Sequence, residues 1–571
     1  MNQLLNTSYL SELIIKKRIP SILICLVLLV VCVQGLPQLT FNPDMDNFFP
    51  ENNDTAEFAQ YIDDTFLPTE NVVIAISTPR ETLFDQETLY LIEQMTEKAW
   101  TIPHSVRADS ITNYSYVRSI EDDLMVEPFI ENALQLSDEF IQNRARVVEG
   151  EKPIFGSLIS KDKRTTVVNI VLDPVIEDKA AASTETFDYL LSYLEEVRTN
   201  HPHLDIRLLG TPYVEYLSPR LIQSEMPIVM PSMFLLIFAT VYLLLRSAFA
   251  VVGTVFVVVL SLVSAFGGIG HMNGVLNQVA MTIPILITTL ALADCVHLFS
   301  LYFQNVQKGL GSQDAMVKSL ELNLQPLFLT TLTTSIGFLC LNFAEVYPLR
   351  LVGNGVAIGV VLAFVYTIFF LAPAISFLNL RAPKRTESQT RFAKRIAYFS
   401  IANSKSIFWG VPIVSVLLIL CIPLNTHDDD PTQMYSENYS SFAKDTLWLD
   451  EKLGGTFPVS FLATSKEGSI SDPAFLREVE QFSDWLESQA EVRHVTSLAN
   501  TMKTLNESMH GDQESWYVIP ESEDLSAQYL FFYEMSLPFG LDLNSSISQD
   551  RQSTKMSASL KNMTSNEYLR F

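Results

Sequence analysis

The stretch from residue 285 to residue 300 reads ILITTLALADCVHLFS and points to the fold class. Apart from two threonines, one histidine, one serine and a single acid, Asp294, it is apolar. It belongs to a segment that can cross ~30 Å of hydrocarbon as a helix, which takes about 20 residues. Seven such segments predict a polytopic α-helical membrane protein. The predicted spans are 19–36, 226–245, 249–270, 281–303, 327–344, 352–378 and 407–424.

Apolar and acidic residues must be segregated along the chain. Its 571 residues combine a hydrophobic fraction of 48% and a mean hydropathy of +0.21 with a formal net charge of −26. The acid excess suits well-solvated soluble domains and argues against nucleic acid as a partner, because phosphate binding needs basic patches. All five cysteines fall in apolar stretches, which argues against disulfides and a cysteine-based zinc site. His201 and His203 alone are too few ligands for structural zinc, so we expect no metal.

Basic residues in the short loops predict the orientation of the spans. Lys16, Lys17 and Arg18 precede the first span, and six bases lie between residues 381 and 395, in the loop between the sixth and seventh spans. The loops on the opposite side, 271–280 and 345–351, carry only two charges. The N-terminus is therefore expected in the cytoplasm. The first span is expected to be an uncleaved anchor, because its apolar run is too long for a signal peptide.

The predicted layout alternates membrane and soluble parts. It comprises a cytoplasmic N-terminus (1–18), a first span (19–36), a first extracytoplasmic α+β porter-like domain (37–225), a bundle of spans two to six (226–378), a cytoplasmic amphipathic connector (379–406), a seventh span (407–424) and a second extracytoplasmic domain (425–571). In the first domain, 72–76 and 167–171 are predicted strands and 88–100 is a predicted helix. The basic, amphipathic stretch 392–401 is expected on the cytoplasmic membrane surface.

The two extracytoplasmic domains resemble each other. Short matches recur in the same order at an offset of about 384–387 residues, which indicates an internal duplication. The matched pairs include Phe58-Ala59 with Phe442-Ala443, 72–76 with 459–463, and Ile92-Glu93-Gln94 with Val479-Glu480-Gln481. A complete duplication would add about five further spans. We therefore expect an incomplete second domain and a chain that lacks spans eight to twelve; a natural protein with half of the repeat is the alternative.

Asp294 is the strongest candidate for a functional residue. An ionised carboxylate within a span costs at least ~2.5–3.5 kcal/mol on insertion scales. The carboxyl can therefore hold a proton at neutral pH and release it when its surroundings change, as proton-coupled transport requires. The alternative is a carboxyl that only hydrogen-bonds neighbouring helices. His297 could relay the proton of Asp294 from the same helical face, or could be an interfacial histidine.

Polar residues of spans five and six are expected to support the relay. These are Thr330, Thr331, Thr334 and Asn354. For each threonine, a hydrogen bond back to its own helix is the alternative. Gly355 and Gly359 form a GxxxG that permits close helix packing. The sequence has no nucleotide-binding P-loop, nucleophile elbow or HExxH helix, so we expect a transporter rather than an enzyme, with protons as the coupling ion and no cofactor.

Three segments resemble the resistance-nodulation-division (RND) superfamily, and within it the MMPL and predicted-exporter branch with a sterol-sensing-like bundle. They are ADCVHL at 293–298, PLFLTTLTTSIGF at 326–338 and DMDNFFP at 44–50. The resemblance implies export driven by the proton-motive force, ferredoxin-like porter domains and a proton-relay role for Asp294. Family members often follow the acid with Tyr or a second Asp, whereas this chain has Cys295.

We therefore expect a proton-antiporting RND-type exporter of hydrophobic or amphipathic substrates, with lipids as the leading class. It would lie in the bacterial inner membrane with its large domains in the periplasm. A homo-oligomer and a periplasmic accessory protein are open as partners. The alternatives are a non-transporting lipid or sterol sensor and an accessory protein of a secretion or envelope-assembly system.

Overall fold

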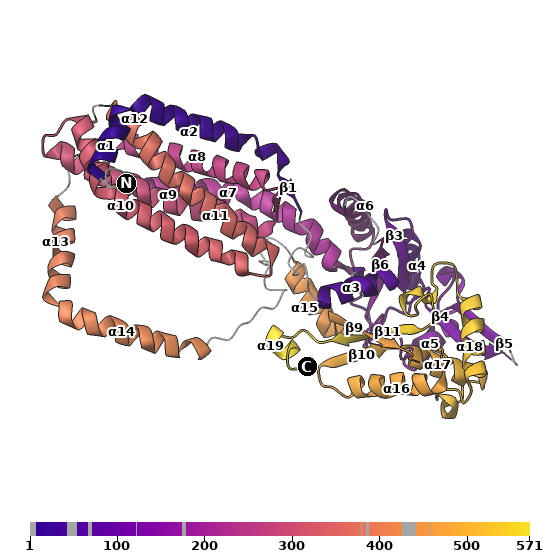
Figure 1. Cartoon of the computed structure of the whole chain (residues 1–571). Coiled ribbons are helices and arrows are strands. Elements are labelled where there is room, and N and C mark those ends of the chain that lie inside the picture. Colours follow the sequence, from indigo (N-terminus) through magenta and orange to yellow (C-terminus); the bar gives the residue numbers. More distant parts are fainter. Residues whose placement is uncertain are drawn as a thin grey trace. The chain divides into compact units, whose positions relative to one another are not determined.

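The chain forms two compact units in a computed structural model (Figure 1). The helical unit comprises residues 1–53 and 219–425, and the mixed unit comprises residues 54–218 and 426–571. The structure describes residues 7–42, 54–66, 71–120, 123–173, 179–378, 380–383, 387–424, 441–455, 457–466 and 468–571. The family-like segment at 44–50 lies outside the described residues.

Six helices among the described residues are long and apolar enough to cross a membrane. They coincide with the first six predicted spans, which confirms a polytopic helical architecture. They are α2 (Arg18–Val33), α7 (Thr211–Leu245), α8 (Ala248–His271), α9 (Ile283–Gln307), α10 (Ser312–Leu339) and α11 (Tyr347–Val365). A short helix α1 (Thr7–Lys16) precedes them, and α12 (Ala372–Ser376) follows. A helix suits this setting because it satisfies its backbone hydrogen bonds internally.

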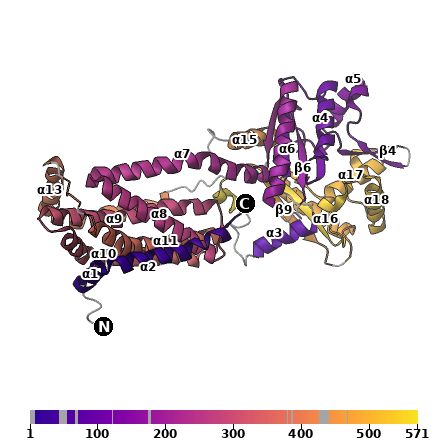
Figure 2. The same ribbon diagram turned by 90° about the horizontal axis from the view of Figure 1, so that it is seen from above.

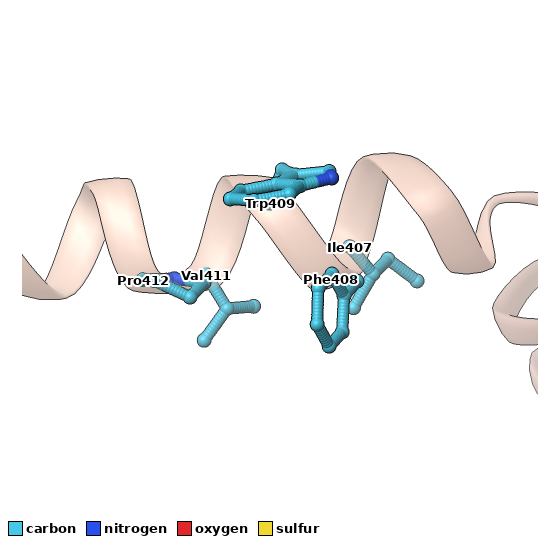
Figure 3. Close-up of a pocket in the computed structure, with 5 residues that line it drawn as sticks. All are labelled: Ile407, Phe408, Trp409, Val411 and Pro412. Atoms are coloured by element: carbon cyan, nitrogen blue, oxygen red, sulfur yellow. The ribbon is translucent and has the colours of Figure 1, made fainter.

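The seventh predicted span, 407–424, lies on α14 (Ser404–Leu420). This helix is long enough to count as a span only together with the end of α13 (Glu387–Ala402), from which it is bent by 82°. None of its side chains is buried. Figure 3 shows five of them on its surface, where they line a shallow hollow: Ile407, Phe408, Trp409, Val411 and Pro412. A seventh crossing stays a prediction.

Small residues bring the helices of the bundle into close contact. Helices α8, α9, α10 and α11 lie side by side, and α2 packs against α8 (Figures 1 and 2). A Cβ added to Gly267 would lie 1.9 Å from the carbonyl oxygen of Cys32, and one on Gly35 would lie 2.0 Å from the carbonyl oxygen of Gly267. A Cβ on Gly359 would lie 2.2 Å from Ile287 Cδ1. A larger residue at Gly35 or Gly267 would require movement of a helix, whereas one at Gly359 would require the Ile287 side chain to shift.

The first sheet of the mixed unit has four antiparallel strands in the order β3-β6-β2-β7. They are β2 (Asn71–Ser77), β3 (Ser105–Ser110), β6 (Thr165–Leu172) and β7 (Asp205–Leu209). Ile74 on β2 lies opposite Val168 on one side and Leu208 on the other. Alternate residues of β2 pack with α4 (Gln86–Ala99) and α6 (Lys179–Asn200) in one apolar core. The two predicted strands and the predicted helix lie on β2, β6 and α4.

The second sheet has three antiparallel strands in the order β10-β11-β9. They are β9 (Phe457–Thr464), β10 (Val492–Thr496) and β11 (Ser553–Leu560), packed with α16 (Pro473–Glu487), α17 (Leu498–Met509) and α18 (Glu523–Ser536). In both sheets a helix joins the first strand to the second, and a strand that comes later in the chain lies between them. The second sheet therefore repeats the order of three strands of the first.

Each polar segment contributes a helix or a hairpin to the packing of the other. Helix α15 (Phe442–Leu453), which precedes β9, covers the open face of the first sheet. Its Asp445 accepts a hydrogen bond from Arg207 of β7 at 2.9 Å, and the guanidinium lies 4.0 Å above the Trp448 ring. Phe66, which follows α3 (Asp54–Thr65), has Lys555 of β11 above its ring at 5.6 Å. The hairpin of β4 (Ser115–Ile120) and β5 (Asp123–Pro128) packs on α17 and α18.

Glu151 lies where the two polar segments meet inside the mixed unit. Its carboxylate accepts a hydrogen bond from the Tyr114 hydroxyl at 3.2 Å. Glu507 and Asp512 of the second segment and Arg144 of the first also act on it electrostatically. Burial raises the pKa of Glu151 to about 7, although the hydrogen bond from Tyr114 opposes the shift.

We expect Gly267→Ala to destabilise the bundle by about 1–3 kcal/mol, because its Cβ would overlap the backbone of α2. Thermal unfolding of the detergent-solubilised chain should show a lower Tm. Gly337→Ala on α10 is the matched control, since nothing lies within 4 Å of its added Cβ. Equal Tm values for the two variants would contradict the close packing of α2 on α8.

We expect the stability of the fold to fall as the pH rises from about 4.5 to about 7. The pKa of Glu151 is raised in the folded state, so the folded chain binds this proton more tightly than the unfolded chain does. The full loss, up to about 3 kcal/mol, is reached above pH 7. Glu151→Gln should remove this part of the pH dependence of Tm. The exposed Glu131→Gln should retain it, and an unchanged slope in Glu151→Gln would contradict the assignment.

Candidate functional site in the helical bundle

Asp294 lies near the middle of α9 and is only 6% exposed. The apolar side chains next to it on the helix, Ala291 and Leu298, belong to the main core of the bundle. Among the residues that the structure describes, no hydrogen bond or ion pair reaches its carboxyl group. A charged carboxylate in such surroundings is costly, so the protonated, neutral form is the one that the site accommodates.

His297 does not meet Asp294 in this structure. Its residue is exposed on the surface of α9, and within the described part of the chain no hydrogen bond joins the imidazole ring to the carboxyl group. The backbone carbonyl of His297 instead accepts a hydrogen bond from the Asn323 side chain of α10 at 3.2 Å. Spacing along the helix places the two side chains one turn apart, but only one of them faces the core.

The contacts between α9 and α10 show how far the threonines of α10 lie from Asp294 along the bundle. The Ser319 hydroxyl donates to the Leu298 carbonyl at 2.8 Å, and the helices run antiparallel. Each step toward the N-terminus of α9 therefore corresponds to a step toward the C-terminus of α10. With Asn323 opposite His297, Thr331 lies near the level of Thr288. That level is about 9 Å along the helix axis from Asp294.

Three buried hydroxyl groups near this level have no hydrogen-bond partner among the described residues: Thr288 on α9, and Thr331 and Ser335 on α10. They are 0%, 5% and 6% exposed. Leaving a buried hydroxyl unpaired costs about 1–3 kcal/mol, so a row of three needs an explanation. Thr330 differs, because its hydroxyl donates to the carbonyl of Pro326 at 3.0 Å. Thr334 is partly buried.

Cys295, next to Asp294, faces α11 rather than the row of hydroxyl groups. Its thiol lies 3.7 Å from the Thr367 hydroxyl, and the neighbouring Tyr366 hydroxyl lies 2.7 Å from that of Ser264 on α8. Here α11 passes into a π-helical segment, Tyr366–Leu371. Wide turns of this kind are frequent at functional sites. Sequence reasoning missed this layer; its only sequence signal is the polar pair Tyr366-Thr367 in an apolar span.

Asn354 lies far from Asp294 along the bundle. Its side-chain amide pairs with that of Asn342 through two hydrogen bonds of 2.8 and 2.9 Å. Helices α9 and α11 run parallel, with Gly355 against Ile283 and Thr367 against Cys295. Asn354 therefore lies about 20 Å along the axis from the level of Asp294. The structure brings it to Asn342 and not to the relay.

Comparison with known families agrees with this architecture. The model of the MMPL family matches residues 110–406, slightly more than half of the chain, and this range includes Asp294 and the threonines of α10. No curated protein matches the chain. The predicted resemblance to the RND superfamily is confirmed, because the MMPL family is part of it. The chain therefore belongs to the MMPL family, a group of multi-pass membrane transporters rather than enzymes.

Proposed function

We propose that this protein is a proton-driven exporter of hydrophobic or amphipathic substrates, with lipids as the leading class, and that Asp294 carries the coupling proton. One observation carries the proposal: a carboxyl group buried in a membrane helix has no partner among the described residues, and a row of unpaired hydroxyl groups begins about 9 Å from it along the bundle axis. A fixed structural acid would be expected to have a partner, whereas a group that gains and loses a proton needs surroundings that change.

In this mechanism the protonation of Asp294 selects between two packings of the bundle. The neutral acid is tolerated in the apolar packing described above. The ionised acid needs polar groups around it, and Thr288, Thr331 and Ser335 are the nearest hydroxyl groups without partners. The π-helical turn in α11 gives the backbone at this depth a geometry that can adjust. One charge that crosses a potential of 100 mV supplies ~2.3 kcal/mol, so a few protons suffice for meaningful export.

The rest of the proposal concerns the architecture. We propose that the mixed unit arose by internal duplication and forms porter-like domains that move substrate. The shared strand order of its two sheets supports this, as does the packing of α15 on the first sheet and of Phe66 beside the second. Basic residues in the short loops support an inner-membrane orientation with a cytoplasmic N-terminus.

Asp294→Asn should reduce proton flux at least about 10-fold, because the amide keeps the shape of the side chain but cannot exchange a proton. The assay is the pH change inside liposomes that contain the full chain and a trapped pH-sensitive dye, with a potential imposed by potassium and valinomycin. Asp314→Asn, at an exposed acid near the start of α10, should leave the flux unchanged. Normal flux through Asp294→Asn would sink the mechanism.

The same liposomes separate this function from the alternatives. An exporter moves a fluorescent phospholipid only while the gradient lasts, so an uncoupler should stop the movement. A non-transporting lipid sensor would bind the probe equally with and without the gradient. Co-purification with a secretion channel, without lipid movement, would favour an accessory role.

Thr331→Val and Thr330→Val form a matched pair on one helix. Thr331→Val should lower proton flux by about 3- to 10-fold, because it removes a buried hydroxyl group near the relay. It should also keep or raise the Tm, since that hydroxyl has no partner in the described part of the chain. Thr330→Val should leave the flux within about 2-fold, because its hydroxyl is paired with its own helix. Equal effects of the two substitutions on proton flux would contradict a role for Thr331 in proton transfer.

A further inference from the structure

The connector between the sixth and seventh predicted spans differs in charge from the rest of the chain. Residues 379–406 contain seven basic residues and one acid, Glu387, although the whole chain has a formal net charge of −26. Most of this segment forms α13, which leads directly into α14 through Asn403. A cluster of this charge in an acidic protein indicates a negatively charged partner.

Helix α13 presents a basic side and an apolar side, and both are exposed. Lys394 and Arg395 flank Tyr398 on one arc of the helix, and Ile396 and Phe399 lie on the adjoining arc, with Phe399 one turn after Arg395. Ile396 and Phe399 are 51% and 63% exposed. Such a pattern fits a helix that lies in a membrane interface, with its apolar side toward the acyl chains and its basic side toward the headgroups.

The bend between α13 and α14 indicates how α13 is oriented relative to the membrane. The two helices meet at 82°, and α14 is apolar with no buried side chain among its residues. If α14 runs across the bilayer, α13 lies in the plane of the membrane surface. Lys405 then lies at the corner, on the same boundary as Lys394 and Arg395. Trp409 projects from the early turns of α14 (Figure 3) and is 69% exposed. In this orientation it lies just inside that boundary.

We propose that α13 and the first turn of α14 form a binding surface for anionic phospholipid headgroups, built around Lys394, Arg395 and Lys405. The apolar side of α13 favours a membrane over an acidic protein as the partner, because it needs an apolar environment next to the anions. Each positive charge near an anionic surface should enrich anionic lipid about 5-fold. The proposal goes beyond transport and does not depend on proton coupling by Asp294.

The native Trp409 reports on this surface. The full chain is placed in nanodiscs of phosphatidylcholine and phosphatidylglycerol, and bromine, which quenches tryptophan fluorescence, is carried on the acyl chains of one lipid or the other. The chain's other four tryptophans lie in the mixed unit, and subtracting the signal of Trp409→Phe isolates Trp409. Brominated phosphatidylglycerol should quench Trp409 several-fold more effectively than brominated phosphatidylcholine at the same mole fraction.

Two double substitutions, one in α13 and one elsewhere, test whether the basic residues cause the preference for anionic lipid. Lys394→Gln with Arg395→Gln should abolish the preference for phosphatidylglycerol, and high salt should weaken it in the wild type. Lys308→Gln with Lys318→Gln, which removes two exposed charges at the end of α9 and the start of α10, should leave it intact. Equal quenching by both lipids in the wild type would overturn the proposal. So would a preference that survives in Lys394→Gln with Arg395→Gln, or the absence of quenching by either lipid, which would mean that protein covers α14.

Discussion

The hydrocarbon interior of a membrane offers no hydrogen-bond partners, and this constraint shapes the helical unit. Backbone groups meet it by forming helices, and glycines of α8 and α11 allow neighbouring helices to approach closely. Because of this constraint, every polar group in the bundle needs a partner within the protein. Most find a partner: Tyr366 pairs with Ser264, and Thr330 with its own helix. Asp294 and the hydroxyl groups of Thr288, Thr331 and Ser335 have none among the described residues, and they lie in neighbouring layers of the bundle.

The mixed unit is stabilised differently from the helical bundle, because water solvates its charges and its apolar side chains are buried in cores. Ile74 and the other inward residues of β2 pack against α4 and α6, as their alternation requires. The far face of the same sheet would be exposed without Leu449 of α15, which the second polar segment supplies. Glu151 marks another place where the segments meet, and its raised pKa follows from burial there. Neither polar segment builds its fold independently of the other.

Periodicity and length predict elements well, since apolar runs and alternating strands are local signals. They predict six spans, the strands β2 and β6, the helix α4 and the burial of Asp294. They do not predict which way a side chain faces across helices. His297 shares a helical face with Asp294 by spacing, yet the packing of α10 leaves it exposed, and Asn354 pairs with Asn342 instead. The π-helical turn at Tyr366 and the pairing of Cys295 with Thr367 depend on three-dimensional packing, so spacing along the chain could not reveal them.

The contact between Arg207 and Asp445 joins residues 238 positions apart, with the whole series from α7 to α14 between them. Contacts of such long sequence separation form late, because the intervening chain must be ordered first. During synthesis the first sheet must therefore wait, with one apolar face uncovered, until the later helices have been inserted and α15 has emerged. Biogenesis would then expose an incomplete sheet for many seconds, which makes this protein a natural client for chaperones that shield edges and apolar faces.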